Sequence, residues 1–367
     1  MNFAIYGNAV PIKQIAEIFT DVNLTCELYG GAENSNKILP QINFFEFRRL
    51  IDAEKLHGII LNTIANAATD IIKECKFYGI PNVCIVNRAL RPIYLLDTHK
   101  GFLGYAETNL IDSCNLNCSG CTHYANLFDK NDFYPIEKHE RDVKNFAAAV
   151  DVLQFRLLGG EPLLLPNLAD YIKITRKYFP QTDLRLVTNG LLLPSASQDL
   201  LDAIRDNGFI VDITLYPPTE KVIDKVSAIL EENKILFTKG SLTNGRTVEN
   251  FFVFLTLHGG HDPQKSRQVC INDTCRFMRD GKIYKCPIDA LSYKFAEKFG
   301  LKGFPKSTGV TIGAPNFVSL LEKLNGNVEC CYWCNETNRQ VAWKTSNKPA
   351  LEEWLANPLE TLSLCRF

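Results

Sequence analysis

Three cysteines that could hold a metal centre lie on one short stretch of the chain. Cys114, Cys118 and Cys121 follow the spacing C-x3-C-x2-C directly after residues 108–111, which are expected to form a strand. Three thiolates on one loop can bind three irons of a [4Fe-4S] cube, and the fourth iron is then open to an exogenous chelator. The alternative is a zinc site built from the same cysteines and His123.

A second motif follows one strand-helix unit later. Gly159, Gly160, Glu161 and Pro162 end a strand expected at 155–158. Glycine lets a ligand approach the backbone, exposed strand-end carbonyls can accept hydrogen bonds from an ammonium group, and Glu161 adds negative charge beside them. Alone, the motif is typical of an ordinary turn. One strand-helix unit after a cysteine-rich loop, the motif is a strong signal.

Composition excludes several classes of protein. The chain has 367 residues, 46% of them hydrophobic, with 40 Lys and Arg against 41 Asp and Glu. This balance does not indicate a nucleic-acid binder or a polybasic membrane surface. No apolar run of about 18 residues predicts a membrane span. The N-terminus shows no secretory signal, so a cytoplasmic protein is expected, and its 13 cysteines indicate metal binding or catalysis rather than disulfides.

The spacing of apolar segments predicts an α/β protein in three parts. Residues 1–97 are expected to form a small Rossmann-like domain. Its strands are expected at 3–6, 24–28, 58–62 and 83–86, and its helices at 11–19, 44–56 and 69–77. Alternating strands and helices favour a parallel sheet. Gly7 lacks the companion glycines that a dinucleotide pyrophosphate needs, so no NAD is expected there. Residues 88–104 are interpreted as a connector.

Residues 105–260 repeat the strand-helix order. Strands are expected at 108–111, 155–158, 184–188, 210–215, 235–237 and 251–257. A capping box at Ser195–Gln198 and a stop at Asn207–Gly208 predict one of the intervening helices. Six strands with interleaved helices indicate a partial (β/α)6 TIM-like barrel, whose functional loops follow the strand ends. Residues 262–367 are cysteine-rich and are interpreted as irregular.

Together, the cysteine loop, the Gly-Gly-Glu-Pro strand end and the partial barrel resemble the radical S-adenosylmethionine (SAM) superfamily over about residues 105–260. The resemblance implies that Cys114, Cys118 and Cys121 bind a [4Fe-4S] cluster, whose open iron is chelated by SAM. The resemblance also implies which residues bind SAM. The methionine amino group is held by Gly159, Gly160, Glu161 and Pro162. Further contacts to SAM or substrate are implied for Thr188, Asn189 and Tyr216. Members commonly carry an aromatic residue before the last motif cysteine. Gly120 stands here instead, and Tyr124 is expected to take its place near the adenine.

The later cysteines resemble a Twitch domain, the shortened form of the SPASM extension, with one auxiliary [4Fe-4S] cluster. Cys286, Cys331 and Cys334 are the implied ligands, with either Cys270, which fits the spacing better, or Cys275 as the fourth. The alternative is a zinc knuckle that uses the same thiolates. Cys330 could only replace its neighbour Cys331. The remaining cysteines are expected to be buried hydrophobes or spare thiols: Cys26, Cys75, Cys84 and Cys365.

The chemistry implied by the family is reductive cleavage of SAM to methionine and a 5'-deoxyadenosyl radical, which takes a hydrogen atom from the substrate. An electron donor such as flavodoxin or ferredoxin is implied. No residue is predicted to be catalytic itself. Polar residues considered for the barrel interior are Arg156, Arg185, Asp212, His258 and His261.

Three hypotheses remain open for the substrate. The first is a polar small molecule such as a sugar or nucleotide-sugar, because the N-terminal unit resembles domains of sugar-modifying proteins. The reaction would then be a dehydrogenation, an epimerisation or an elimination. The second is a peptide, modified by a maturase of the same superfamily. The third is a non-catalytic zinc-binding module, which metal analysis separates from the other two.

Overall fold

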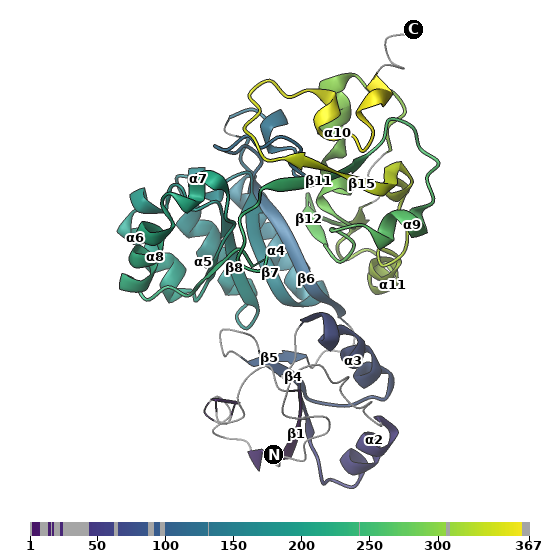
Figure 1. Ribbon diagram of the computed structural model, residues 1–367. Coiled ribbons are helices and arrows are strands. Elements are labelled where there is room, and N and C mark those ends of the chain that lie inside the picture. The colour runs from purple at the N-terminus through teal and green to yellow at the C-terminus, as the bar shows by residue number, and fades with distance from the viewer. Residues whose placement is uncertain are drawn as a thin grey trace. The chain divides into compact units, whose positions relative to one another are not determined.

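The fold is described from a computed structural model of the chain (Figure 1). The structure describes residues 2–7, 14–15, 17, 23–24, 44–61, 65–86, 92–95, 100–130, 132–241, 243–305 and 309–361. Most of the helix expected at 11–19, most of the strand expected at 24–28, and both Cys26 and Cys365 lie outside these residues. The chain divides into two compact units.

The first unit comprises Met1–Tyr105 together with Val150–Phe155 and Phe179–Asp183. Its sheet has the order β2-β1-β3-β4-β5. The elements are β1 (Asn2–Tyr6), β2 (Asn23–Leu24), α2 (Phe44–Asp52), β3 (Gly58–Leu61), α3 (Ala65–Phe77), β4 (Val83–Val86) and β5 (Pro92–Leu95). The first four strands run parallel, and alternate residues of β1, β3 and β4 enter two separate buried clusters. Such two-sided burial is typical of parallel sheets, so the predicted α/β class is confirmed.

The connector expected at 88–104 is not a plain linker. It contains β5, which pairs antiparallel with β4, and the first residues of β6 (Gly101–Ile111). Pro92 opens β5 at the edge of the sheet, where the missing N–H of proline is tolerated.

The second unit is built on a sheet with the order β10-β9-β8-β7-β6-β12-β13-β14. Its remaining strands are β7 (Val150–Gly159), β8 (Asp183–Thr188), β9 (Ile210–Ile213), β10 (Phe237–Lys239), β12 (Phe277–Arg279), β13 (Lys282–Tyr284) and β14 (Val310–Thr311). The helices between β6 and β10 are α4 (Ile136–Ala149), α5 (Leu168–Tyr178), α6 (Gln198–Asp206), α7 (Pro217–Glu220) and α8 (Ile223–Glu232). This order confirms five of the six predicted strands and the helices between them. β12 adds a parallel neighbour on the other side of β6.

The sixth predicted barrel strand belongs to a different sheet. β11 (Asn250–Leu255) pairs antiparallel with β15 (Cys334–Ala342) and not with β10. Figure 1 shows this ribbon beside α9 (Pro263–Gln268), which packs on β15. The expectation of a sixth barrel strand was therefore wrong, because an apolar run predicts a buried strand without indicating its partner.

The C-terminal part is more regular than expected. It carries β12–β15 together with α9, α10 (Pro287–Phe299) and α11 (Phe317–Lys323). The cap predicted for α6 also differs, since Ser197 and not Ser195 accepts the hydrogen bond from Leu200 N at 3.3 Å. The predicted stop is confirmed, because Asn207 ends α6 and Gly208 has a φ of 58°. Within the described ranges, no helix combines the length and the apolar character needed to cross a bilayer.

Candidate active site

The cysteines of the C-x3-C-x2-C motif lie together on the loop that follows β6. Burial, together with the charges of Glu161 and Cys121, raises the pKa of Cys114 to about 12. Burial also raises the pKa of Cys118, again with a contribution from Cys121. These mutual effects identify the three sulfurs as neighbours. Leu116 N lies 3.4 Å from Cys114 Sγ and donates to it, as expected where a sulfur carries negative charge.

A segment near the C-terminus braces this loop. We call residues 343–346 the bracing segment. Its carbonyl at Lys344 accepts a 2.9 Å hydrogen bond from Ser119 N. Its indole at Trp343 donates from Nε1 to Cys118 Sγ at 3.2 Å. Sequence reasoning missed this segment, because its residues carry no motif and lie more than 220 positions from the cysteines that they contact.

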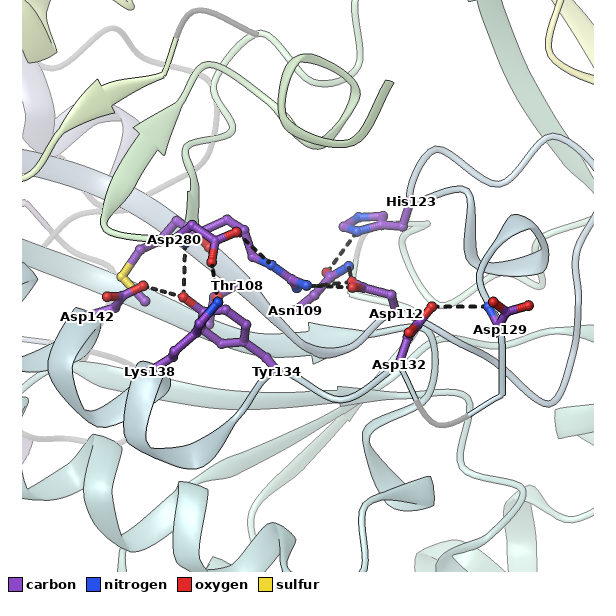
Figure 2. Close-up of polar contacts among 12 residues, drawn as sticks. Thr108, Asn109, Asp112, His123, Asp129, Asp132, Tyr134, Lys138, Asp142 and Asp280 are labelled. Carbon is purple, nitrogen blue, oxygen red and sulfur yellow. Dashed lines mark hydrogen bonds and ion pairs between the residues drawn. The ribbon is translucent and has the colours of Figure 1, made fainter. Parts of the chain in front are cut away.

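A buried polar network fixes the start of the loop (Figure 2). Arg279 holds the Asp112 carboxylate through bonds of 3.1 and 2.6 Å. Asn109 Nδ2 donates to Asp112 at 2.8 Å, and its Oδ1 faces His123 Nδ1 at 3.0 Å. Because that oxygen only accepts, Nδ1 of His123 carries the proton. Burial lowers the pKa of His123 to about 4, so its imidazole is neutral near pH 7.

The same network ties the β12–β13 turn to α4. Tyr134 donates a short hydrogen bond to the buried Asp142, and Asp280 N donates to Tyr134 Oη at 3.0 Å. Lys138 pairs with Asp280 at 3.4 Å, as Figure 2 shows. These contacts hold β12 next to β6, the strand that leads into the cysteine loop.

Gly159 and Gly160 are needed because backbone of the cysteine loop occupies the place of a side chain. A Cβ on Gly159 would lie 2.0 Å from Ile111 O, and one on Gly160 would lie 1.8 Å from Ser113 O. Gly160 N and Glu161 N donate to these same carbonyls at 2.7 and 3.0 Å. The glycines were expected to make room for a ligand. In the structure they make room for the end of β6 and the start of the cysteine loop, so the two motifs pack closely together. Their contact with a ligand stays a prediction.

Glu161 is fully buried and joins the ends of two strands. Its Oε1 accepts from Thr188 Oγ1 at 2.6 Å and from Leu163 N at 3.1 Å, and its Oε2 accepts from Asn189 N at 2.8 Å. Burial raises the pKa of Glu161 to about 7, against the opposing effect of these hydrogen bonds. Pro162 follows as the first residue of a 3-10 turn. Both carboxylate oxygens of Glu161 therefore accept hydrogen bonds from groups of the protein.

Thr188 and Asn189 lie where they were predicted, at the end of β8. The side chain of Asn189 reaches the cysteine loop, since its Nδ2 donates to Asn115 Oδ1 at 2.7 Å and lies 3.9 Å from Cys114 Sγ. The strand end, the Gly-Gly-Glu-Pro motif and the cysteine loop therefore meet at one place.

Tyr216 also lies at this place. It stands three residues beyond the end of β9, as the N-cap of α7. Burial raises the pKa of its hydroxyl well above the usual value, and the nearby Cys118 and Cys121 raise it further. Its ring packs against the Trp343 indole, with ring centres 6.2 Å apart.

Tyr124 has different neighbours. Its fully buried ring packs on Phe295 of α10 and on Trp354, at 5.6 and 6.1 Å between ring centres. Burial raises the pKa of its hydroxyl, and Cys330 and Cys334 then raise it further. The hydroxyl is thus close to the second group of cysteines. The adenine contact expected of Tyr124 stays a prediction.

The second group of cysteines surrounds one cavity, which we call the auxiliary cavity. Its lining comprises Phe254, Ser266, Arg267, Cys270, Asn272, Lys285, Cys286, Ile288, Cys330, Cys331 and Cys334. All three cysteines named as the safer ligands are among them. Cys330 lines the cavity together with Cys331, and hydrogen bonding to Cys286 and Cys334 raises its pKa well above the usual value. Cys330 is therefore a fifth thiol at this site and not simply a substitute for its neighbour.

Of the two candidates for the fourth position, Cys270 lines the auxiliary cavity, whereas Cys275 is absent from the described lining. Cys275 instead donates from its thiol to Asn272 Oδ1 at 3.8 Å. Asn272 N in turn donates to Cys270 Sγ at 3.4 Å. This geometry favours Cys270 as the fourth ligand.

Two cations share one carboxylate beside this cavity. Asp273 pairs with Lys285 at 3.1 Å and with Arg267 at 2.7 Å. Lys285 is only 2% exposed and also donates to Leu324 O at 3.1 Å. Burial raises the pKa of Cys270 and of Cys331, and the charge of Lys285 offsets part of this effect at Cys331.

Three of the five polar residues considered for the barrel interior meet in one buried ion cluster. Arg156 and Arg185 lie 3.1 and 3.5 Å from Asp212 Oδ2, and all three are buried. His258 is exposed and His261 is half-buried, and neither is among the described residues that pair in this ion cluster.

The donors at both sites are cysteine thiols. Three lie on the loop after β6, and five line the auxiliary cavity. A [4Fe-4S] cube takes one thiolate at each iron, so the chemistry of both donor sets fits such clusters.

Comparison with known proteins identifies one domain of the chain. Residues 108–234 match the model of the radical SAM superfamily. GTP 3',8-cyclase of Heliobacterium modesticaldum is 29% identical over 137 residues, which are 37% of this chain and 42% of that protein. GTP 3',8-cyclase of Trichormus variabilis is 38% identical over 103 residues, 27% of this chain and 31% of that protein. The chain thus spans less than half the length of these relatives.

Solved structures are also similar to parts of the chain. BtrN in complex with AdoMet and 2-DOIA is 14% identical with a TM-score of 0.37, and the match covers 69% of this chain and 98% of that one. Streptococcus suis SuiB bound to S-adenosylmethionine is 12% identical with a TM-score of 0.37, over 78% and 76% of the two chains.

The matched residues contain the cysteine loop, the Gly-Gly-Glu-Pro strand end and the strands β7, β8 and β9. These features define a radical SAM domain, a class that uses a [4Fe-4S] cluster and SAM. Residues 108–234 carry a radical SAM domain, and the predicted resemblance is confirmed for this part of the chain. The match ends before the auxiliary cavity, so the Twitch-like part of the resemblance stays a prediction.

Proposed function

We propose that this chain is a radical SAM enzyme whose first cluster is held by Cys114, Cys118 and Cys121. The observation that carries the proposal is the close packing of the cysteine loop on Gly159 and Gly160, which joins the two motifs into one site. When bound, the cluster and SAM supply a carbon-centred radical that removes a hydrogen atom from the substrate. The protein orients that substrate and excludes water and oxygen.

The chain's own residues give the SAM site its shape. Glu161 fixes Thr188 and Asn189 next to the cysteine loop through three buried hydrogen bonds. The carbonyls of the Gly159–Pro162 strand end are the proposed acceptors for the methionine amino group. Tyr216 is proposed as a further contact, because its hydroxyl lies near the loop sulfurs.

The auxiliary cavity is proposed to hold a second [4Fe-4S] cluster in a Twitch-like domain, residues 262–367. The proposed ligands are Cys270, Cys286, Cys331 and Cys334, with Cys330 as a fifth thiol. The neighbouring Lys285 and Arg267 offset part of the negative charge that such a cluster carries. Their charge favours a role as electron acceptor for an oxidised substrate.

The proposed substrate is a polar small molecule such as a sugar or nucleotide-linked sugar. Support comes from the polar barrel interior at Asp212 and from the parallel α/β sheet of the N-terminal domain, residues 1–97. The curated relatives are named for a reaction of GTP, which is consistent with a polar, nucleotide-like class. A cytoplasmic flavodoxin or ferredoxin is the proposed electron donor.

The test is anaerobic reconstitution, followed by dithionite and SAM. We expect about eight irons and about eight sulfides per chain, and formation of 5'-deoxyadenosine. Stoichiometric zinc without iron, or a fully loaded protein that forms no 5'-deoxyadenosine with or without candidate substrates, would overturn the proposal. Candidate sugars and nucleotide-sugars can then be ranked by the increase in 5'-deoxyadenosine that each one causes.

A further inference from the structure

The auxiliary cavity contains a hydrogen-bond donor without an acceptor among the described residues. Asn272 lines the cavity and is only 8% exposed, and its Nδ2 makes no hydrogen bond there. A buried donor that stays unsatisfied costs about 1–3 kcal/mol, so native proteins normally supply an acceptor. The acceptor for this amide is therefore expected inside the cavity.

Two contacts fix the direction of the amide. The thiol of Cys275 donates to Asn272 Oδ1 at 3.8 Å, so the oxygen end of the amide is occupied. Asn272 N donates to Cys270 Sγ at 3.4 Å, which anchors the backbone at the cavity wall. Because the side-chain oxygen and the backbone of Asn272 are both held, its NH2 group is the part of the amide that can donate to an acceptor inside the cavity.

The chemistry of the wall indicates what the acceptor is. Five of the lining residues are cysteines. If they held a cluster, their sulfurs would be anionic hydrogen-bond acceptors inside this cavity. A hydrogen bond to an anionic acceptor is stronger than one to a neutral group. Reduction of a cluster adds negative charge, so a donor that faces its sulfur stabilises the reduced state more than the oxidised one.

We propose that Asn272 Nδ2 donates a hydrogen bond to a sulfur of the cluster in the auxiliary cavity and thereby raises its reduction potential. In this arrangement Cys275 is a positioning residue that holds the amide, and not a ligand. The inference rests on the second cluster of the proposed function. It concerns the ease of reducing that cluster, and leaves the first cluster unaffected.

The experiment is an EPR-monitored redox titration of the reconstituted full chain and of Asn272→Leu, which keeps the size and removes the N–H. We expect reduction of the second cluster to become about tenfold less favourable, which lowers its midpoint by about 59 mV. One exchangeable-deuteron coupling should disappear from its reduced spectrum. Added SAM perturbs only the first cluster, which identifies its signal, and the midpoint of that cluster should not change.

A second variant covers the case in which Asn272→Leu fails to retain iron. Asn272→Asp keeps the acceptor for Cys275 but replaces the N–H with oxygen, and it should lower the second midpoint further. Cys275→Ser, whose hydroxyl can still donate to Asn272, should keep the wild-type midpoint. Unchanged midpoints in both Asn272 variants would overturn the inference while leaving two clusters in place. A wild-type chain with only about four irons would overturn the second cluster and this inference together.

Discussion

The two groups of cysteines are assembled in opposite ways. The first group, Cys114, Cys118 and Cys121, lies within eight consecutive residues after one strand. The second group comes from separate segments, with Cys270 after α9, Cys286 at the start of α10, and residues 330–334 after α11. Local spacing alone can define the first site, whereas only the folded chain can define the second.

The first group nevertheless depends on distant residues as well. Its loop packs on Gly160, is bonded to the bracing segment 343–346, and offers the Cys121 carbonyl to Trp354 Nε1 at 2.9 Å. In the first group, the spacing of the ligands is therefore set by neighbouring residues in the sequence. In both groups, the orientation of the ligands depends on contacts with residues far away in the sequence. The predictions below test this distinction.

The largest effect is expected from Cys118→Ala. Removal of one of three loop thiolates should abolish 5'-deoxyadenosine formation, because a cube with only two protein ligands is not retained. About four of eight irons should remain, since the auxiliary cavity does not use this residue. Iron analysis and product assay check both parts. Persistent product would disprove the ligand assignment, and loss of all the iron would show that the two sites do not load independently.

Gly160→Ala should be the next most damaging change. The added Cβ would lie 1.8 Å from Ser113 O, and backbone cannot rotate away as a side chain can. We expect destabilisation of about 3 kcal/mol, measured by urea unfolding of the iron-free protein. Gly326→Ala is the matched control, because its Cβ would lie 3.2 Å from Lys323 O. It should change stability by less than about 1 kcal/mol. Equal effects of the two substitutions would contradict the packing argument.

Cys270→Ser and Cys275→Ser sharpen the description of the second group. Cys270 lines the auxiliary cavity, so its replacement should remove about half of the iron and the second EPR signal. Cys275 bonds Asn272 instead, and a serine hydroxyl can keep that contact. Its variant should retain about eight irons. The reverse pattern would make Cys275 the fourth ligand.

The sequence was sufficient wherever the information was local. The strand-helix order up to β10 and the three loop cysteines followed from spacing and periodicity. The residues 250–255 show the limit, because an apolar run fits a buried barrel strand equally well, and its true partner β15 begins about 80 residues later. Gly160 was named from the sequence for the approach of a ligand, which stays a prediction. No pattern reveals that Ser113 backbone fills its side-chain position.

The second site shows the same limit. Spacing left Cys270 and Cys275 unresolved and treated Cys330 only as a substitute for Cys331, because adjacent residues in a strand or helix point apart. Residues 329–333 form a 3-10 turn, and both thiols line the cavity. Trp343 carried no signal at all in the sequence. Its importance arises only from a contact across 225 positions.

The smallest effect, and the finest test of the comparison, is expected from Trp343→Phe. The substitution keeps an aromatic ring next to Tyr216 and removes only the N–H that donates to Cys118 Sγ. Reduction of the first cluster should become about tenfold less favourable, so its midpoint potential should fall by about 59 mV. The midpoint potential of the second cluster should not change. Trp354→Phe is the control, because it removes a donor to the Cys121 carbonyl and not to a sulfur, and it should shift the first midpoint less. If Trp343→Phe shifted the midpoint potentials of both clusters equally, the bracing segment would affect them by stabilising the fold in general. A specific effect through the Cys118 sulfur would then be disproved.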